Sequence, residues 1–409
     1  MLKREARWLL IVLLIVALLL RQGLIVLLLG LIGLALVITQ LWARWAFRRV
    51  EYQRMFSSDR AFVGDEVQFM QRIANAKLLG LPSLHISDDV PTKLELVDGR
   101  LLPHTQPYRG VLRRWIALRP YEAVTWSTTI RCRERGYYAF GPAHLEVSDA
   151  FGLETRELDL PERQHLLVYP QLIVLPNLHL RAQHPIGDAR TPRQLLTDPA
   201  RTMGVRDYRR DDPLKAIHWG ATAKRGELQT RIYEPTTSLD VAIVLDLDTF
   251  EYYWEGIRYD LIEYMISAAA TVATTAAHDR LRFGLYSNGA PADSGQLVRM
   301  PPSRSPAQLP LALEMLAKLV PHSVTSMPNL LRRIGPELSW GATIVLISAV
   351  ASTDVQTALL RLKGRRIVWL YANEDRPPEV PGIEVVPLSL DTHQWSDQRS
   401  HQSFAAVSV

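Results

Sequence analysis

The sequence is poor in cysteine, and this scarcity limits the kinds of protein that it can encode. Its 409 residues include a single cysteine, Cys132, so no intramolecular disulfide can form. A secreted scaffold held together by disulfides is therefore disfavoured, and the chain is compatible with a reducing compartment. The same scarcity leaves no paired-cysteine metal motif.

The sequence also lacks the motifs of several large enzyme classes. It contains no glycine-rich loop of the kind that cradles phosphates and no nucleophile elbow. The formal net charge of +5 is small, so it does not by itself imply a nucleic-acid partner. No defined chemical activity follows from these residues. The length of 409 residues indicates two or three domains.

Two long apolar runs dominate the first fifty residues. They cover residues 8–20 and 24–47, and residues 21–23 separate them. A bilayer core of about 30 Å needs about 20 helical residues, which the second run supplies. The first run is short enough to resemble the apolar stretch of a signal peptide, but no small-residue cleavage site follows it. We predict a transmembrane helical hairpin over residues 1–50, with local bilayer thinning around the shorter helix.

Basic residues flank this hairpin and predict its orientation. The tip carries only Arg21, whereas the flanks hold Lys3, Arg4, Arg7, Arg44, Arg48, Arg49 and Arg54. Cytoplasmic flanks of membrane helices collect Lys and Arg. We therefore expect a protein of the inner membrane with two crossing helices and the bulk of the chain in the cytoplasm. The alternative is a single span with the bulk outside.

Residues 51–180 alternate polar and apolar side chains with a period of two, as in 66–73 and 84–87. Short runs of this kind, separated by glycine-containing turns, indicate β-strands. Several such strands predict a β-sandwich of immunoglobulin-like type.

The rest of the chain divides into three segments. Residues 181–235 read as a polar loop followed by a charged segment, and residues 391–409 read as a polar tail. Between them, residues 236–390 predict strands at 241–247, 282–286, 343–348 and 366–371 and helices at 256–279, 306–319 and 353–362. This alternation predicts a mainly parallel sheet covered on both faces, whose ligands lie beyond the carboxyl ends of its strands.

The charged segment carries a recognisable pattern. Its matching positions are Arg206, Tyr208, Asp211, Ile217, Trp219 and Ala223, and a second match is residues 149–153, Asp-Ala-Phe-Gly-Leu. With these motifs the chain resembles a bacterial family known as domain of unknown function 58. Two departures are Arg210, where the family has glycine, and Lys224, where it has arginine. If the glycine of the family uses positive φ, the turn at Arg210 is strained or different.

The resemblance implies that residues 236–390 form a domain like von Willebrand factor type A. Such domains typically hold Mg²⁺ through Asp-x-Ser-x-Ser after the first strand, and this chain has Asp246, Asp248 and Thr249 there. Phe250 cannot ligate a hard cation, and Ala349 stands where an aspartate often follows a later strand. We expect a degraded site that binds Mg²⁺ weakly or not at all, and Asp246 could instead cap the next helix.

The basic residues of the central segment have two interpretations. Arg206, Arg209, Arg210 and Lys215 could contact phosphates of nucleic acid or lipid headgroups. Because acidic residues interleave with them, ion pairs that hold the two large domains together are the favoured interpretation. We expect Trp219 to anchor one domain to the other. His218 is expected to be structural, since no nucleophile or metal partner has recognisable spacing from it.

The leading hypothesis is a membrane-anchored cytoplasmic scaffold that is not an enzyme and binds a partner protein through its type A-like domain. The resemblance implies a MoxR-type AAA ATPase as the partner, in assembly or remodelling of membrane or envelope complexes. No nucleic-acid partner is expected. The alternatives are a divalent-metal-dependent hydrolase that uses Asp246 and Asp248, and binding of anionic lipid or nucleic acid through the central basic segment.

Overall fold

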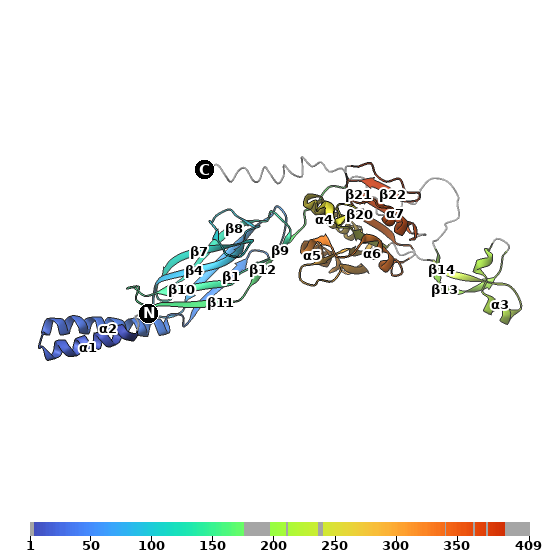
Figure 1. Cartoon of the computed structure of the whole chain (residues 1–409). Helices are drawn as coiled ribbons and strands as arrows, with labels where there is room; N and C mark the ends of the chain where they lie inside the picture. The colour runs from blue at the N-terminus through green and yellow to red at the C-terminus, as the bar shows by residue number, and fades with distance from the viewer. Residues whose placement is uncertain are drawn as a thin grey trace. The chain divides into compact units, whose positions relative to one another are not determined.

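The computed structural model describes residues 4–175, 197–209, 212–235, 240–339, 341–362, 365–373 and 375–388. The chain forms two compact units, Met1–Tyr169 and Pro170–Val409. Figure 1 shows a helical pair and a group of strands in the first unit, and mixed helices and strands in the second. The predicted tail at 391–409 lies outside the described residues, as does much of the loop predicted before the charged segment.

Helices α1 (Arg4–Leu19) and α2 (Gly23–Trp45) lie against each other. The turn between them is built around Arg21, whose φ of 53° is left-handed. The N–H groups of Leu20 and Gln22 donate back to the carbonyls of Val16 and Ala17, which closes the end of α1. The helical pair predicted from the two apolar runs is therefore present.

The structure corrects the prediction that both helices cross a membrane. Among the described residues, one helix is long and apolar enough to do so, and that helix is α2, with 23 residues. Helix α1 has 16 residues, which reach roughly 24 Å at about 1.5 Å per residue and fall short of the bilayer core. Helix α2 therefore suggests a membrane anchor, and α1 packs beside it.

The rest of the first unit consists of three sheets. The order of the first is β1-β3-β8-β5, of the second β11-β10-β4-β7-β6, and of the third β2-β12-β9. The strands are β1 (Val50–Phe56), β2 (Arg60–Phe62), β3 (Glu66–Asn75), β4 (Leu81–Pro91), β5 (Glu95–Leu96), β6 (Leu102–Pro103), β7 (Arg109–Leu118), β8 (Ala123–Arg131), β9 (Gly136–Phe140), β10 (Ala143–Ser148), β11 (Thr155–Leu160) and β12 (Gln164–Tyr169). All contacts between strands are antiparallel except that of β2 with β12.

Alternating side chains of these strands form the core. Along β3, for example, Val67, Phe69 and Ile73 are buried, whereas Gln68 and Arg72 are exposed. One core cluster joins all three sheets through residues such as Phe69, Val90 and Phe140. The period of two in the sequence therefore reports one buried face per strand. Cys132 lies in this core and is a free thiol.

The charged segment of the second unit forms a hairpin. Strands β13 (Thr197–Asp207) and β14 (Gln229–Pro235) pair antiparallel, and between them lie the 3-10 helix η1 (Leu214–Ala216) and helix α3 (Trp219–Arg225). Helix α3 ends because Gly226 adopts a φ of 77° and returns its N–H to the carbonyl of Thr222.

The α/β part has a six-stranded sheet in the order β18-β16-β15-β20-β21-β22. Five of its strands are parallel and β18 is antiparallel. The strands are β15 (Asp240–Leu245), β16 (Arg282–Ser287), β18 (Arg299–Ser303), β20 (Thr343–Ser348), β21 (Arg366–Tyr371) and β22 (Glu384–Pro387), and a small hairpin pairs β17 (Gly289–Pro291) with β19 (Leu319–Ser323). A 3-10 helix η2 (Tyr253–Glu255) precedes α4.

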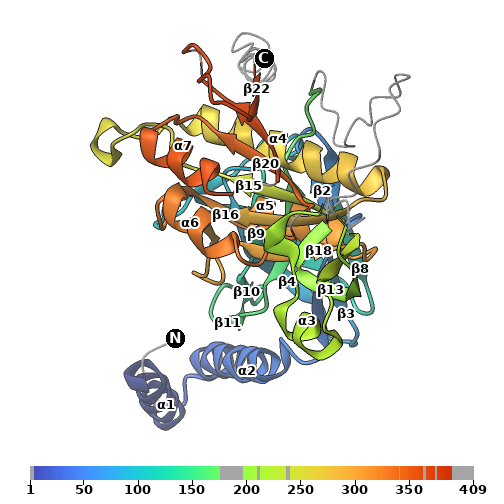
Figure 2. The ribbon, with the colours of Figure 1, turned by 90° about the vertical axis from the view of Figure 1, so that its right-hand side faces the viewer.

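Helices cover both faces of this sheet (Figure 2). Helices α6 (Met327–Ile334) and α7 (Thr353–Leu360) share one core cluster with alternate residues of β15, β20 and β21. Helix α4 (Tyr259–His278) packs on β15, β16 and β20, and α5 (Gln308–Lys318) lies against α4. The predicted parallel sheet with two covered faces is confirmed. The helix predicted from residue 256 begins at Tyr259, so Ile257 precedes it and is exposed.

The connections of the sheet change direction at its centre. Strand β15 leads through α4 to β16 on one side, whereas β20, on the other side of β15, leads through α7 to β21. A crevice opens where neighbouring parallel strands send their chains to opposite sides. The residues that follow β15 and β20 are therefore the place to look for a site.

Candidate functional site

A buried pair of carboxyl groups follows β15. Asp246 is 1% exposed and its N–H still donates to the carbonyl of Ile347 on the next strand. The Oδ1 atom of Asp246 accepts two hydrogen bonds, from Nδ2 of Asn288 at 2.7 Å and from the N–H of Asp248 at 3.1 Å. Asp248 Oδ1 accepts the hydroxyl of Ser323 at 2.5 Å. Loops after β15 and β16 and the end of β19 thus meet at one point.

Asn288 fixes the electrostatics of this pair. Its Oδ1 accepts the N–H of Leu247 at 2.9 Å, so its NH₂ group must face the carboxyl groups. That NH₂ group donates to Asp246 Oδ1, and also lies 3.3 Å from Asp248 Oδ2. Asn288 is fully buried. It therefore places an amide donor between two acids that would otherwise repel each other.

Burial raises the pKa of both acids. The pKa of Asp246 is raised well above its ordinary value, first by desolvation and second by the charge of Asp248. Desolvation also raises the pKa of Asp248, while the hydrogen bond from Ser323 opposes that rise. Because Asp246 is the more deeply buried acid, it is the one that holds a proton first.

These residues do not fit a hard divalent cation. The side chain of Thr249 is turned to the backbone, since its Oγ1 accepts the N–H of Arg258 at 3.1 Å. Phe250 and Ala349 have no ligating atom, and the Asn288 NH₂ group already donates to both acids. Across the described ranges no group of three or more His, Cys, Asp or Glu side chains could hold a metal.

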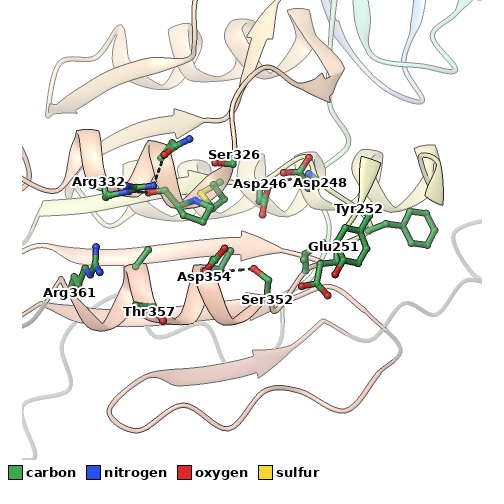
Figure 3. A pocket seen from close by; sticks show the side chains of 17 residues that line it. Asp246, Asp248, Glu251, Tyr252, Ser326, Arg332, Ser352, Asp354, Thr357 and Arg361 are labelled. Carbon is green, nitrogen blue, oxygen red and sulfur yellow. Dashed lines mark hydrogen bonds between the residues drawn. The ribbon is translucent and has the colours of Figure 1, made fainter. Parts of the chain in front are cut away.

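Beside the acids lies an open cavity of about 470 Å³ between the loop after β15 and helices α6 and α7. Its lining is polarised, as Figure 3 shows: Asp246, Asp248 and Glu251 lie at one end, and Arg332 and Arg361 lie at the other. Phe250, Tyr252, Met327 and Val355 add apolar surface to the lining. Tyr252 is 48% exposed, and its ring stacks on Trp254 at a centroid distance of 4.7 Å.

Both helices begin at the cavity. Ser326 and Ser352 are the N-cap residues of α6 and α7, and Oγ of Ser352 accepts the N–H of Val355 at 3.4 Å. Arg332 lies on α6, where its Nη2 donates to Asn329 Oδ1 at 2.6 Å, and Arg361 is the C-cap residue of α7. The cavity thus has acids at one end and arginines at the other, with Asp354 and the two serines between them, which suits a charged peptide segment better than a small apolar ligand.

Residues 204–396, which contain this cavity, match the family model described as protein of unknown function DUF58. The chain therefore carries a DUF58 domain over these residues. This confirms the family that the charged segment indicated. No curated protein matches the chain.

Two similar solved structures are distant from this chain both in sequence and in fold. A non-cellulosomal cohesin from the archaeon Archaeoglobus fulgidus is 13% identical, over 29% of this chain and 91% of the cohesin, with a TM-score of 0.20. The sporulation control protein Spo0M from Bacillus subtilis is 10% identical, over 29% of this chain and 49% of Spo0M, with a TM-score of 0.18. Scores this low support no conclusion about function.

The DUF58 match includes the charged segment, where the structure places most of the signature residues on one hairpin. Arg206 and Asp212 form a two-pronged ion pair, with Nη1 to Oδ2 at 2.7 Å and Nη2 to Oδ1 at 2.5 Å. Hydrogen bonds from Arg206 and from the N–H of Arg209 lower the pKa of Asp212 to about 2. The N–H of Tyr208 donates to the carbonyl of Leu228, and Ile217 is buried against β14.

The other residues of the signature have different positions. Trp219 begins α3 and is 68% exposed, and Ala223 lies within that helix. His218 caps α3, because its Nδ1 accepts the N–H of Ala221 at 3.0 Å. Asp211 and Arg210 lie outside the described residues. The roles predicted for Trp219 and the ion pairs in joining two domains stay predictions. Among the described residues of this segment, the ion pairs Arg206–Asp212 and Arg225–Asp207 are local.

Sequence reasoning missed several residues of the site. Asn288 and Ser323 hold the two acids, and α6 with Arg332 forms one wall of the cavity. Ser-Met-Pro at 326–328, an N-cap serine followed by a proline near the helix start, was a signal for α6. For Asn288 the sequence held no comparable signal beyond its position after a strand.

Proposed function

We propose that this protein is a membrane-anchored adaptor that binds another protein at the cavity beyond β15 and β20. The polarised lining supports this proposal most directly. Arginine and aromatic residues are enriched at protein interfaces, and Arg332, Arg361 and the exposed Tyr252 supply both kinds here. The acids at the other end of the cavity add charge selectivity.

We propose further that the α/β part is a type A-like domain and that the three sheets of the first unit form an immunoglobulin-like sandwich. Asp246 follows the first parallel strand, as the type A pattern requires, and helices flank both sheet faces. The shared core of the three sheets supports the second assignment. The donor positions lost at Phe250 and Ala349 make partner binding independent of Mg²⁺.

The adaptor is proposed to lack catalytic activity. The hydrogen-bonding atoms of Asp246 and Asp248 face Asn288 and Ser323, and His218 caps a helix. These groups are engaged in holding the structure. A role for Asp246 and Asp248 in hydrolysis would require those contacts to be exchanged for substrate or metal.

The anchor is proposed to place the bulk of the chain in the cytoplasm. Arg44 lies in the last turn of α2 and Arg48 and Arg49 follow it directly, and all three are exposed, so they mark the side of the membrane on which the rest of the first unit lies. Cytoplasmic flanks are rich in such residues. The proposed partner is a MoxR-type AAA ATPase, in assembly or remodelling of membrane or envelope complexes.

Site-specific photocrosslinking tests this function. A benzophenone amino acid at Tyr252, 48% exposed at the cavity, is compared with one at Leu311, 42% exposed on α5. In native membranes the Tyr252 probe should form an adduct with the ATPase, identified by mass spectrometry, and Arg332→Glu should reduce its yield several-fold. Equal adduct yields at the two positions, or an ATPase absent from the Tyr252 adducts, would refute the proposal.

A further inference from the structure

The end of α2 is fixed onto the first unit by specific contacts. Trp42, in the last turn of α2, donates its Nε1 hydrogen to the carbonyl of Gly80 at 3.1 Å, and Lys77 Nζ donates to the carbonyl of Ala46 at 2.8 Å. Ala46 is completely buried in a core cluster with Ile73 and Leu118. The loop of residues 76–80 therefore lies at the level of the last helical turn.

A second loop packs against the first. The N–H of Tyr121 donates to the carbonyl of Lys77 at 3.2 Å. Asn75 joins both loops, because its Nδ2 donates to the carbonyls of Leu79 at 2.9 Å and of Arg119 at 3.0 Å. Residues 76–80 and 118–122 thus form one surface beside the end of α2, which we call the rim.

The rim exposes side chains that are costly in water and suited to a lipid interface. Leu78 is 75% exposed and Tyr121 is 70% exposed. Tyr121 also has a left-handed φ of 57°, a conformation that residues other than glycine rarely adopt. Arg119 on the rim, and Arg48 and Arg49 at the helix end, are exposed cations.

The depth of α2 decides where this surface lies. Its 23 residues reach roughly 35 Å at about 1.5 Å per residue, slightly more than the bilayer core. Its last turn therefore reaches the headgroup layer, where tryptophan is enriched. Trp45 is half exposed there, and the Arg48 guanidinium lies over its ring at 4.2 Å. Gly80, whose carbonyl accepts the hydrogen bond from Trp42, must lie at the same depth.

We infer that the rim is a lipid-contact surface, which inserts Leu78 and Tyr121 into the headgroup layer of the bilayer that α2 enters and sets its cations against lipid phosphates. The contact fixes the orientation of the first unit relative to the bilayer, which a flexible link to the membrane would not do. The inference rests on the proposed membrane anchor, and the test below separates the two.

Tyr108 provides a matched control for Tyr121. Tyr108 is 73% exposed and has a φ of 61°, so it resembles Tyr121 in both respects. The two tyrosines lie beyond opposite ends of β7 (Arg109–Leu118). Ten residues of strand span roughly 33 Å at about 3.3 Å per residue, so Tyr108 lies far from the rim.

The test uses the full chain in liposomes of phosphatidylcholine and phosphatidylglycerol. An environment-sensitive fluorophore is attached at Leu78→Cys, Tyr121→Cys, Tyr108→Cys or Leu31→Cys, the last being an exposed position on α2. Cys132 is buried and does not compete for the label. We expect a spin-labelled lipid to quench the fluorophore at positions 31, 78 and 121 and iodide to quench it several-fold more at 108 than at 78 or 121.

The outcomes distinguish the two ideas. Lipid quenching at position 31, with positions 78 and 121 as open to iodide as 108, refutes the rim contact and leaves the anchor standing. Iodide access at position 31 refutes the anchor itself. The unlabelled chain provides a second measurement that does not depend on the variants: a photoactivatable phosphatidylcholine should modify peptides spanning 76–80 and 118–122 but not the peptide containing Tyr108.

Discussion

At the scale of single residues, the Asp246 side chain shows how a fold accommodates a buried acid. It is almost completely removed from water, and its partners are hydrogen-bond donors without full charge. A carboxyl group in such a place is stable as the neutral acid, because ionisation without a cation is costly in a desolvated site. The pair of acids is therefore expected to make the fold sensitive to pH.

The expected effect has a definite sign. The native pKa of Asp246 is raised above the ordinary value of 3.8, so above that pH the unfolded chain releases a proton that the native state keeps. The free energy of unfolding therefore falls as pH rises, by at most about 1.4 kcal/mol per pH unit, until the native pKa is reached. Asp246→Asn keeps the shape without the proton and should make this fall shallower, because only the contribution of Asp248 then remains. The variant should be at least as stable as the original chain at neutral pH.

Thermal unfolding of the detergent-solubilised chain between about pH 4 and pH 8 measures the difference between the two proteins. Asp88, whose pKa burial also raises, contributes equally to both and cancels. Asn288→Asp is the matched control: it replaces the amide donor with a third acid and should steepen the fall. Parallel curves for Asp246→Asn and the original chain would show that Asp246 is not the titrating group.

The sequence identified Asp246 and Asp248 but not the residues that hold them. Both acids stand directly after an apolar strand, which is a local pattern. Asn288 reaches them only because β15 and β16 are parallel neighbours in register, with Leu245 opposite Ser287. Such a contact depends on strand pairing, and no spacing along the chain encodes it.

At the scale of elements, continuous apolar runs were enough to predict where two central strands lie. The predicted strands 343–348 and 366–371 coincide with β20 and β21, because each is buried on both faces and so forms a continuous apolar run. The missed elements are short or contain proline: β18 reads Arg-Met-Pro-Pro-Ser, and β17 and β22 have three and four residues. Their strand character comes from pairing with a neighbour, not from their own composition.

The pairing of β16 with the antiparallel β18 depends on Gly284. A Cβ atom at Gly284 would lie 2.5 Å from the carbonyl oxygen of Met300 and 2.8 Å from the nitrogen of Pro302. Both are backbone atoms, so β18 would have to move. Gly284→Ala is expected to cost more than about 2 kcal/mol locally.

Hydrogen exchange followed by mass spectrometry should show faster exchange in peptides of β16 and β18 in this variant. Gly204→Ala in β13 is the control, because nothing lies within 4 Å of its added Cβ atom. Its exchange pattern should match that of the original chain. Unchanged exchange of β16 and β18 in Gly284→Ala would mean that the sheet edge absorbs the methyl group.

At the scale of the whole molecule, the chain consists of an apolar helical pair, a β-sheet region and an α/β region, in that order. The apolar runs predicted the N-terminal helical pair, but length alone decided that one helix qualifies to cross a bilayer. How the two compact units act together is not encoded in any local pattern. It depends on which side of the membrane they occupy, and this can be measured directly.

Cysteine labelling with a membrane-impermeant maleimide reports that side. The native Cys132 should not react with the maleimide. It is buried, and burial raises its pKa to about 12, so it stays a thiol, which reacts much more slowly than a thiolate. Trp115→Cys introduces a thiol at a position that is 73% exposed in the first unit, and Gln22→Cys introduces one at the exposed turn between α1 and α2.

In inverted vesicles Trp115→Cys should react, and in intact cells it should not, since a cytoplasmic unit is shielded by the bilayer. Gln22→Cys should show the opposite pattern, because α2 is long enough to carry the turn to the far side. Labelling of Trp115→Cys in intact cells would place both compact units outside. A cytoplasmic ATPase could then not reach the cavity beside Asp246, so the measurement constrains the partner as well as the topology.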